Sequence, residues 1–531
     1  MGIPYYFTYI IKNHNNIIDN LKNISNIHEL YLDSNSIIYD SINMDNFENQ
    51  KQFEANIIKN VIQKIEFIIK SIKPKNFVYI AFDGIPPFAK LNQQKNRRYK
   101  NQYQDIIFNK KKKWDTASIT PGTNFMNNLD KEITNHFNNS YYKLNLSNQN
   151  GEGEHKIFKY IRQQFENNNE NTDKNILIYG MDADLIMLSL NHLKYCPNIY
   201  LFRETPDFIN TINSNFNKDE KYYINIKFLA NEIYKILLKN TTNISYEKII
   251  EQDNFYNKLS DYIFICFLLG NDFIPHSPSL NIRTNGITIL LELYKQLFDN
   301  NQFLTNIHNI KINWKNFKLF LHKIAENEEY FIKNNYDIAI KKSKKYFSDK
   351  TEEEKIYKYT CTPQWEKNLE NFINPYEKFW EYRYYYCIFN KDIDIENQFI
   401  SNLSNEYLKI LLWTFNYYCN DCISWNYFYN YSYPPLIMDL YKNIPYFDSE
   451  ISIEYNNTIV HPLTTLSYVL PKNSLNLLPK KIENYLNTHY KEHYNYEHEI
   501  IYPFCNYLWE GHVEFTEINI NDFIKKIETL I

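Results

Sequence analysis

The chain has 531 residues, 44% of them hydrophobic and 23% charged, which is enough for roughly two to four domains with sizeable cores. The net charge of -4 excludes a protein that is basic overall, so any surface for a polyanion must be local. Seven cysteines without a disulfide-like framework predict a reducing compartment, and the apolar runs are too short to span a membrane. We therefore expect a cytoplasmic protein that has no membrane segment, with the nucleus as the open alternative.

Three apolar stretches are each predicted to be a strand that ends close to an acidic residue. The stretches are 30–32, 77–82 and 176–179, and the acids that follow them are Asp33, Asp83, Asp182 and Asp184. Between the first two, the spacing of apolar side chains from Ile57 to Ile69 predicts a long amphipathic helix. Strands that alternate with helices predict a parallel α/β sheet, in which ligands bind at the carboxyl ends of the strands.

A basic helix is predicted over residues 89–100. Lys90, Gln94, Arg97 and Arg98 lie at positions i, i+4, i+7 and i+8, so their side chains share one face. Such a face suits a terminal phosphate, because arginine can bind it with two hydrogen bonds. On its own, this segment is explained as well by an ordinary solvated basic helix.

The stretch Gly151–Lys156 carries two acids, Glu152 and Glu154, between glycines at the start of a predicted helix. Bringing two carboxylates together is unfavourable unless cations neutralise them, and hard divalent ions prefer oxygen ligands. A solvated acidic helix start is the alternative, since acids favour the positive end of a helix. A seventh acid, Asp272, follows a buried helix that Gly270 closes.

The composition changes along the second part of the chain. Residues 1–334 are predicted to form a first domain, residues 335–360 a charged linker, and residues 361–531 a second region dense in aromatic side chains. Bases stack on such rings at roughly 1–3 kcal/mol each. A large aromatic core explains most of these rings, and we expect only one or two of them to face a substrate.

A series of motifs resembles the eukaryotic 5′→3′ exoribonucleases of the Xrn family over nearly the whole chain. In order, the matching stretches are 1–4, 32–38, 82–84, 89–98, 119–123, 151–156, 179–188, 269–276, 424–434, 461–471 and 509–511. The resemblance implies a nuclease domain of the PIN/flap-endonuclease type with a mostly parallel sheet flanked by helices. The second region is then expected to be largely helical and to complete the active-site pocket.

The resemblance also implies the residues of the site. Two Mg²⁺ ions, for which Mn²⁺ can substitute, are expected on Asp33, Asp83, Glu152, Glu154, Asp182, Asp184 and Asp272. The expected pocket for a 5′-monophosphate consists of Lys90, Gln94, Arg97 and Arg98. Tyr39 stands where the family usually has a base-stacking histidine, and its partner is Trp425, with Tyr427 as the alternative register. The approach to the acid pair, Asn148–Asn150, departs from the family pattern.

The expected activity is processive 5′→3′ degradation of single-stranded RNA with a 5′-monophosphate, in RNA decay after a decapping enzyme has acted upstream. We expect a monomer that releases nucleoside 5′-monophosphates by two-metal-ion hydrolysis. A flap-type or DNA-directed nuclease and an RNA-binding scaffold that does not cut are the alternatives. The aromatic second region argues against the first, and the seven acids argue against the second. The AT-biased composition and the chain end soon after Gly511 suggest a compact form from a protist or a large DNA virus.

Overall fold

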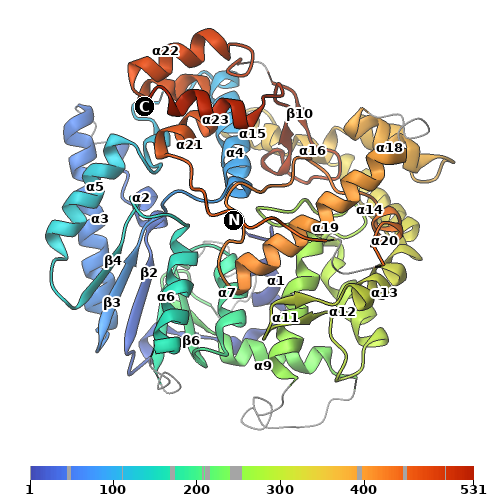
Figure 1. Ribbon diagram of the computed structural model, residues 1–531, viewed down its shortest axis with the longest axis horizontal. Coiled ribbons are helices and arrows are strands. Elements are labelled where there is room, and N and C mark those ends of the chain that lie inside the picture. The colour runs from blue at the N-terminus through green and yellow to red at the C-terminus, as the bar shows by residue number, and fades with distance from the viewer. Residues whose placement is uncertain are drawn as a thin grey trace.

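A seven-stranded sheet organises the first part of the chain (Figure 1). The computed structural model describes residues 2–44, 49–110, 112–167, 174–205, 209, 216–239, 254–390, 397–446, 451–496 and 498–531. The strands are β1 (Ile18–Asn20), β2 (Glu29–Asp33), β3 (Phe77–Ala81), β4 (Tyr142–Asn145), β5 (Asn175–Tyr179), β6 (Asn198–Arg203) and β7 (Tyr222–Asn225). Their order is β1-β7-β6-β5-β2-β3-β4. Neighbouring strands from β6 to β4 are parallel, and among the described strands of this sheet only β7 runs antiparallel to its neighbours, β6 and β1. The predicted, mostly parallel α/β sheet is therefore confirmed.

Successive residues of the central strands point to opposite faces of this sheet. In β2, Leu30 and Leu32 belong to one buried cluster, whereas Tyr31 belongs to another. Strands that are buried on both faces read as continuous apolar runs, and this explains why the three predicted strands stand out in the sequence. Because β2 lies between β5 and β3, the carboxyl ends of these three strands meet at one edge.

Helices cover both faces of the sheet, and further helices extend the fold. Up to residue 325 the α-helices are α1 (Tyr6–Asn13), α2 (Asn35–Asp40), α3 (Gln50–Ile72), α4 (Phe88–Ile107), α5 (Asn124–His136), α6 (Gly153–Asn167), α7 (Asp184–His192), α9 (Ile226–Leu237), α11 (Phe255–Cys266), α12 (Gly286–Leu297) and α13 (Trp314–Ala325). The side chains of α2, α3 and α5 pack with one face of the sheet. Those of α6, α7, α9 and α11 pack with the other face.

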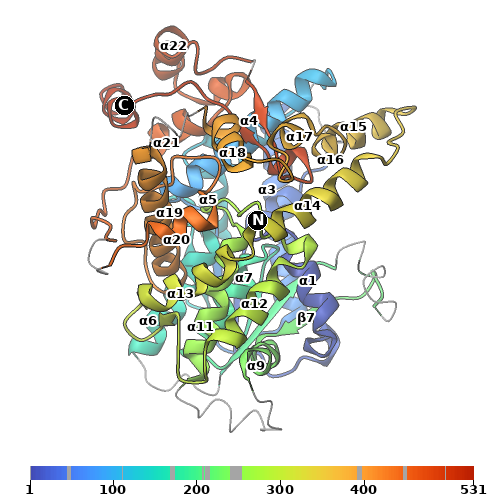
Figure 2. The ribbon, with the colours of Figure 1, turned by 90° about the vertical axis from the view of Figure 1, so that its right-hand side faces the viewer.

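The rest of the chain is largely helical. Its α-helices are α14 (Glu328–Ser343), α15 (Glu352–Thr360), α16 (Thr362–Trp365), α17 (Asn368–Ile373), α18 (Trp380–Phe389), α19 (Asn397–Cys419), α20 (Ile437–Lys442), α21 (Pro462–Val469), α22 (Lys480–His489) and α23 (Ile520–Glu528). Two short hairpins pair β8 (Thr305–Asn306) with β9 (Lys311–Ile312) and β10 (Ile500–Ile501) with β11 (His512–Val513). The predicted linker 335–360 contains the second half of α14 and all of α15, which Figure 2 shows at the upper right.

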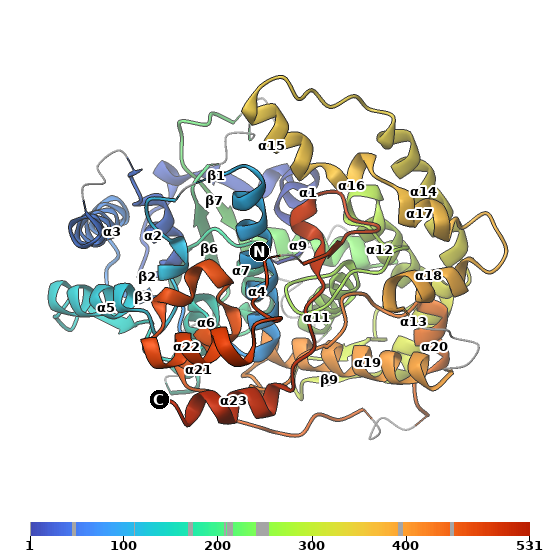
Figure 3. The same cartoon turned by 90° about the horizontal axis from the view of Figure 1, so that it is seen from above.

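One cluster of buried side chains, the central core, joins the two parts of the chain. It runs from Tyr31 in β2 through Phe264 in α11 to Trp413 in α19, each of them at most 1% exposed. A separate cluster packs α21, α22 and α23 against Leu91 and Tyr99 of α4, and Figure 3 shows these helices beside α4. In the described part of the chain, no helix combines the length and the apolar character that crossing a bilayer requires.

Candidate active site

Carboxylates from neighbouring strands meet at the carboxyl edge of the sheet. Asp33 is the last residue of β2, and Asp83 follows β3 after one residue. Both approach Gly153 at the start of α6, whose backbone N–H donates to Asp83 Oδ1 over 2.7 Å. A β-carbon on Gly153 would lie 2.5 Å from Asp33 Oδ1, so only glycine fits there. Burial and the charges of Asp83 and Asp182 raise the pKa of Asp33 well above its usual value.

Glu152 and Glu154 are part of this cluster and are buried. Each is 4% exposed, and their carboxylate oxygens lie within 4.8 Å of one another and of a His155 ring nitrogen. Gly151 (φ +100°) gives the backbone the sharp turn that precedes α6. Burial and the charge of Asp184 raise the pKa of Glu154. The alternative of a solvated acidic helix start is therefore wrong, because neither carboxylate faces water.

The remaining acids lie at the start of α7 and in the loop after α11. Asp184 is 2% exposed, and burial together with the charge of Asp272 raises its pKa to about 7. Asp182 acts electrostatically on both Asp33 and Glu154, which places it in the same network. All seven predicted acids thus lie close enough to influence one another's charge.

Lys90 is a cation within this acid cluster. Its ammonium lies 2.5 Å from Glu152 Oε2 and 2.7 Å from Asp272 Oδ2. Burial alone would lower the pKa of Lys90, but the charges of Asp272 and Glu152 raise it above its usual value. The Lys90 charge in turn keeps the pKa of Asp272 low although Asp272 is buried. The ammonium therefore contacts the acids, rather than standing apart from them in a phosphate pocket.

The chemistry of the cluster fits divalent cations. Three buried carboxylate oxygens, Asp33 Oδ1, Glu154 Oε2 and Asp184 Oδ1, have no hydrogen-bond partner. Unpaired carboxylate oxygens in a dry site are unfavourable until a cation or a proton satisfies them. Oxygen-only coordination is the preference of hard divalent ions such as Mg²⁺. Seven acids around one lysine thus form a site that can hold metal.

The other three residues of the predicted phosphate pocket lie further along α4. Arg98 Nη2 donates to Thr120 Oγ1 over 2.7 Å, while Arg98 Nη1 is buried without a hydrogen-bond partner. Burial and the neighbouring charge of Arg97 lower the pKa of Arg98 to about 10. Gln94 is half-buried and Arg97 is exposed. A buried guanidinium with an unused N–H group is suited to an anion, although its role as a phosphate ligand stays a prediction.

The rings predicted to stack on bases come from the end of α2 and from the segment that follows α19. Tyr39 is 46% exposed at the end of α2, and its charge acts on the pKa of Arg98. Trp425 is half-buried, and its carbonyl accepts a hydrogen bond from the N–H of Phe88 over 2.9 Å. The Tyr427 phenol instead donates to Glu406 Oε2 over 3.0 Å. The Tyr427 side chain is thus fixed by its hydrogen bond to Glu406. The assignment of Trp425 as the ring that stacks on a base stays a prediction.

Helix α19 of the second region contributes residues that the sequence analysis did not assign to the site. The Tyr417 hydroxyl donates a 3.0 Å hydrogen bond to Glu152 Oε1, and its ring stacks on His155 with centroids 3.7 Å apart. Burial and the charge of Asp184 raise the pKa of the neighbouring Tyr418 phenol, so that hydroxyl also lies close to the acids. Tyr417 and Tyr418 are visible in the sequence as an aromatic pair, but nothing there marks them as neighbours of the acids.

Three further features support the site: the backbone at Gly2 and the side chains of Asp130 and Asn35. A β-carbon on Gly2 (φ +56°) would lie 2.2 Å from Asp184 Oδ1, so the N-terminal segment packs directly against this acid. The atypical approach to the acid pair is fixed by Asp130, whose carboxylate accepts hydrogen bonds from the N–H groups of Ser147 and Asn148. Asn35 adds an amide whose nitrogen donates to Asp83 Oδ2 over 2.7 Å.

Comparison with known proteins identifies the family. The model described as "XRN 5'-3' exonuclease N-terminus" matches residues 1–205, and the model described as "Xrn1 helical domain" matches residues 252–371 and 343–518. The chain is 26% identical to 5'-3' exoribonuclease 1 of Saccharomyces cerevisiae and 26% identical to that of Homo sapiens. Both matches cover 90% of this chain but only 40% and 31% of the relatives, so the chain spans less than half of their length. With both models matched in order and covering most of its residues, the chain belongs to the Xrn family.

Proposed function

We propose that this protein is a processive 5′→3′ exoribonuclease that degrades single-stranded RNA with a 5′-monophosphate. The observation that carries the proposal is the buried cluster of seven carboxylates around Lys90, with the unused guanidinium N–H of Arg98 on the same helix. The relatives that match over 90% of the chain are named 5'-3' exoribonucleases, which supports the same reaction. We infer that the protein acts as a monomer after a decapping enzyme has exposed the 5′-monophosphate.

The acids are proposed to hold two Mg²⁺ ions, for which Mn²⁺ can substitute. When bound, such ions activate the attacking water and stabilise the charge of the leaving oxygen. Lys90 fixes the positions of the Glu152 and Asp272 carboxylates relative to each other, because its ammonium contacts both of them. The hydroxyl of Tyr417 holds the other oxygen of Glu152. The protein therefore orients its ligands before the substrate arrives.

The substrate end is proposed to be fixed by groups on α2, α4 and the segment that follows α19. Gln94, Arg97 and Arg98 bind the terminal phosphate, with Lys90 at the boundary between phosphate and metal ligands. Tyr39 and Trp425 stack on the first bases, and stacking together with phosphate contacts reads no base edges. Sequence preference should thus be weak, while the chemical state of the 5′ end should matter strongly.

A single assay tests this function. RNA of one sequence is offered with a 5′-monophosphate, a 5′-hydroxyl or a 5′-triphosphate in Mg²⁺ buffer, beside single-stranded DNA and a DNA flap. Release of nucleoside monophosphates from the 5′ end of the first substrate alone is the expected result. Cleavage of the flap in preference to RNA would instead support the flap-type nuclease. Binding of RNA without mononucleotide release would support the scaffold.

A further inference from the structure

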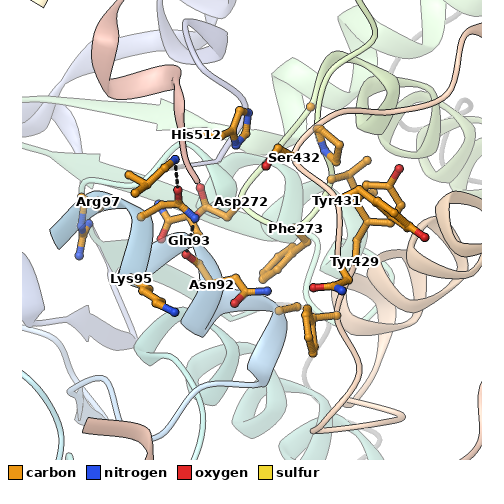
Figure 4. Close-up of a pocket in the computed structure, with 18 of the residues that line it drawn as sticks. Asn92, Gln93, Lys95, Arg97, Asp272, Phe273, Tyr429, Tyr431, Ser432 and His512 are labelled. Atoms are coloured by element: carbon orange, nitrogen blue, oxygen red, sulfur yellow. Dashed lines mark hydrogen bonds between the residues drawn. The ribbon is translucent and has the colours of Figure 1, made fainter. Parts of the chain in front are cut away.

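A cavity of about 930 Å³ lies beside α4, next to the acid cluster. Lys90, Gln94 and Arg98 of α4 are not part of its lining. The residues of α4 that line it are Phe88, Ala89, Asn92, Gln93, Lys95, Asn96, Arg97 and Lys100. Figure 4 shows Gln93 and Arg97 on the helix side of the cavity and Ser432 with Tyr431 on the opposite side. Its volume is within the range of about 300–1,000 Å³ that is typical of small-molecule sites.

The cavity begins where the acid cluster ends. Asp272 contacts Lys90 inside the cluster and also lines the cavity. Gly2, whose backbone packs against Asp184, lines the cavity as well. Arg97 lies at the boundary, since it belongs to the predicted phosphate pocket and to the cavity wall. A phosphate released from the acids therefore has a cation within reach on the cavity side.

The cavity wall carries basic side chains that are not in ion pairs with acids of the described residues. Within the part of the chain that the structure describes, none of Lys95, Arg97 and Lys100 forms an ion pair. Lys95 is 3% exposed, and its amino group contacts His493 Nε2 at 2.8 Å and lies over the rings of Tyr468 and Phe515, while burial lowers its pKa well below the usual value. Lys100 donates to backbone carbonyls. Burial lowers the pKa of Lys100 to about 8. An anionic ligand in the cavity would supply the missing negative charge.

Two of the acids in the wall already have cationic partners, although the charge of Glu510 also acts on Lys100. Asp272 is bound to Lys90, and Glu510 is paired with Arg283 at 2.7 Å. Glu514 and Glu517 are exposed.

The wall also offers groups that suit a nucleobase. Gln93 Oε1, Asn271 Nδ2 and Asn426 Oδ1 are buried atoms of lining residues, and none has a hydrogen-bond partner. Such unpaired groups are unfavourable unless a ligand or water satisfies them. Phe428 and Tyr431 contribute rings to the same wall. Phosphate-binding cations, amide donors and acceptors, and aromatic rings together match a nucleoside monophosphate.

We propose that this cavity receives the nucleoside 5′-monophosphate product and lets it leave while the RNA stays bound. The inference rests on the proposed function, in which the RNA enters by its 5′ end. The product then forms ahead of the remaining RNA, which occupies the entrance and blocks the way back. A processive enzyme of this kind needs a second route for its product, and the cavity borders the acid cluster at Asp272, whereas Arg98 is not part of its lining.

Narrowing the cavity tests the proposal. Ser432 is half-buried on the wall opposite α4, and Ser432→Trp places an indole in the space. In rapid-quench experiments on 5′-monophosphate RNA, the first mononucleotide should form at the wild-type rate. Later steps should be slower by about tenfold or more, because release of each product then limits the next cleavage. Asn430→Trp, an exposed residue of the same wall, should have the same effect in weaker form.

Controls separate this outcome from misfolding and from failure of the function itself. Ser71→Trp adds the same ring at an exposed position of α3, far in sequence from the cavity wall, and should leave every step unchanged. Equal slowing of the first and later steps in both cavity variants, or no slowing in folded protein, would overturn the cavity proposal. Absence of mononucleotide release from the wild-type protein would overturn the proposed function instead.

Product inhibition gives an independent readout with AMP as the probe. AMP bound in the cavity coexists with RNA, so inhibition should be noncompetitive with respect to 5′-monophosphate RNA. Ser432→Trp should weaken this inhibition about tenfold, since the ring fills the space that AMP would occupy. Purely competitive inhibition, unchanged by Ser432→Trp, would mean that AMP binds only in the 5′-phosphate pocket and would contradict the proposal.

Discussion

The hydroxyl of Tyr417 donates a hydrogen bond to Glu152 across 3.0 Å, although 265 positions separate the two residues in the chain. The same ring lies flat on His155, with 20° between the two planes. Helix α19 thereby holds one of the two acids that open α6. A residue that holds a metal ligand in place changes metal affinity without touching the metal.

Tyr417→Phe should therefore weaken metal binding by about 10- to 100-fold, because Glu152 loses its donor while the ring and its packing remain. The measurement is a Mn²⁺ titration of the protein without RNA, by isothermal calorimetry or electron paramagnetic resonance. Tyr407→Phe is the matched control, since Tyr407 lies on α19, is equally buried and donates to Pro275 O instead. Equal metal affinity in the two variants would show that Tyr417 has only a packing role.

Asp184→Ala should abolish turnover and leave RNA binding intact, because Asp184 is proposed to be a metal ligand and not a contact to the RNA chain. The expected loss is roughly a hundredfold or more in the rate of mononucleotide release. RNA affinity is measured separately by fluorescence anisotropy with 5′-monophosphate RNA. Full activity of Asp184→Ala in Mg²⁺ buffer would disprove the metal assignment.

Arg98→Ala should remove the preference for a 5′-monophosphate over a 5′-hydroxyl end. A charge-assisted hydrogen bond is worth about 1.5–3 kcal/mol, so the ratio of the two rates should fall by about ten- to hundredfold. Lys70→Ala, which removes an exposed cation of α3, should leave this ratio unchanged. If Arg98→Ala keeps the wild-type ratio of the two rates, Arg98 does not belong to the 5′-phosphate pocket.

Gly2→Ala should reduce activity strongly, because a β-carbon at this position would lie 2.2 Å from Asp184 Oδ1. Either the N-terminal segment or the acid must shift, and misplacement by about 1 Å can cost roughly a hundredfold in rate. Mononucleotide release and Mn²⁺ affinity are compared with those of Asn13→Ala, an exposed change at the end of α1. If Gly2→Ala keeps the wild-type rate and the wild-type Mn²⁺ affinity, the N-terminal segment can shift without moving Asp184.

Glu328 predicts a pH dependence of stability outside the active site. It is 4% exposed, accepts hydrogen bonds from the N–H groups of Ile437 and Met438, and burial raises its pKa from 4.5 to about 7. The folded protein then binds the proton more tightly than the unfolded chain does, so stability falls as the pH rises from about 4.5 to 7. The loss between pH 5 and pH 8 is about 2 kcal/mol.

Thermal unfolding of Glu328→Gln, followed at both pH values with a chelator present, checks this. The variant should lose that part of the pH dependence, because the amide does not titrate. A pH dependence identical to that of the wild-type protein would mean that Glu328 is ionised in the fold.

Several features of the site were predictable because they follow from local pattern. Asp33 and Asp83 follow apolar runs, and parallel strands bring such ends together whatever the distance along the chain. The helical spacing of α4 was equally visible. The role of Lys90 was not, because periodicity places a side chain on a face but does not say that its ammonium reaches Glu152 and Asp272.

Other features depend on tertiary packing and leave no local signal. Tyr417 has the sequence surroundings of any core tyrosine in α19, and only the packing of that helix against α7 places it beside Glu152. Strands β1, β4, β6 and β7 were missed as well, since at least half of the residues in each of them are half-buried or exposed and their apolar pattern is weak. The requirement for glycine at position 2 also leaves no local signal, because it arises from Asp184, which is far away in the sequence.

The central core has a consequence for how this protein can be divided. Tyr31, Phe264 and Trp413 belong to one continuous interior, so a fragment that ended near residue 334 would expose apolar side chains of α11 to water. It would also leave Glu152 without the phenol that holds it. A fragment that contained every carboxylate of the cluster would therefore still lack part of the interior that supports them and the tyrosine that holds Glu152.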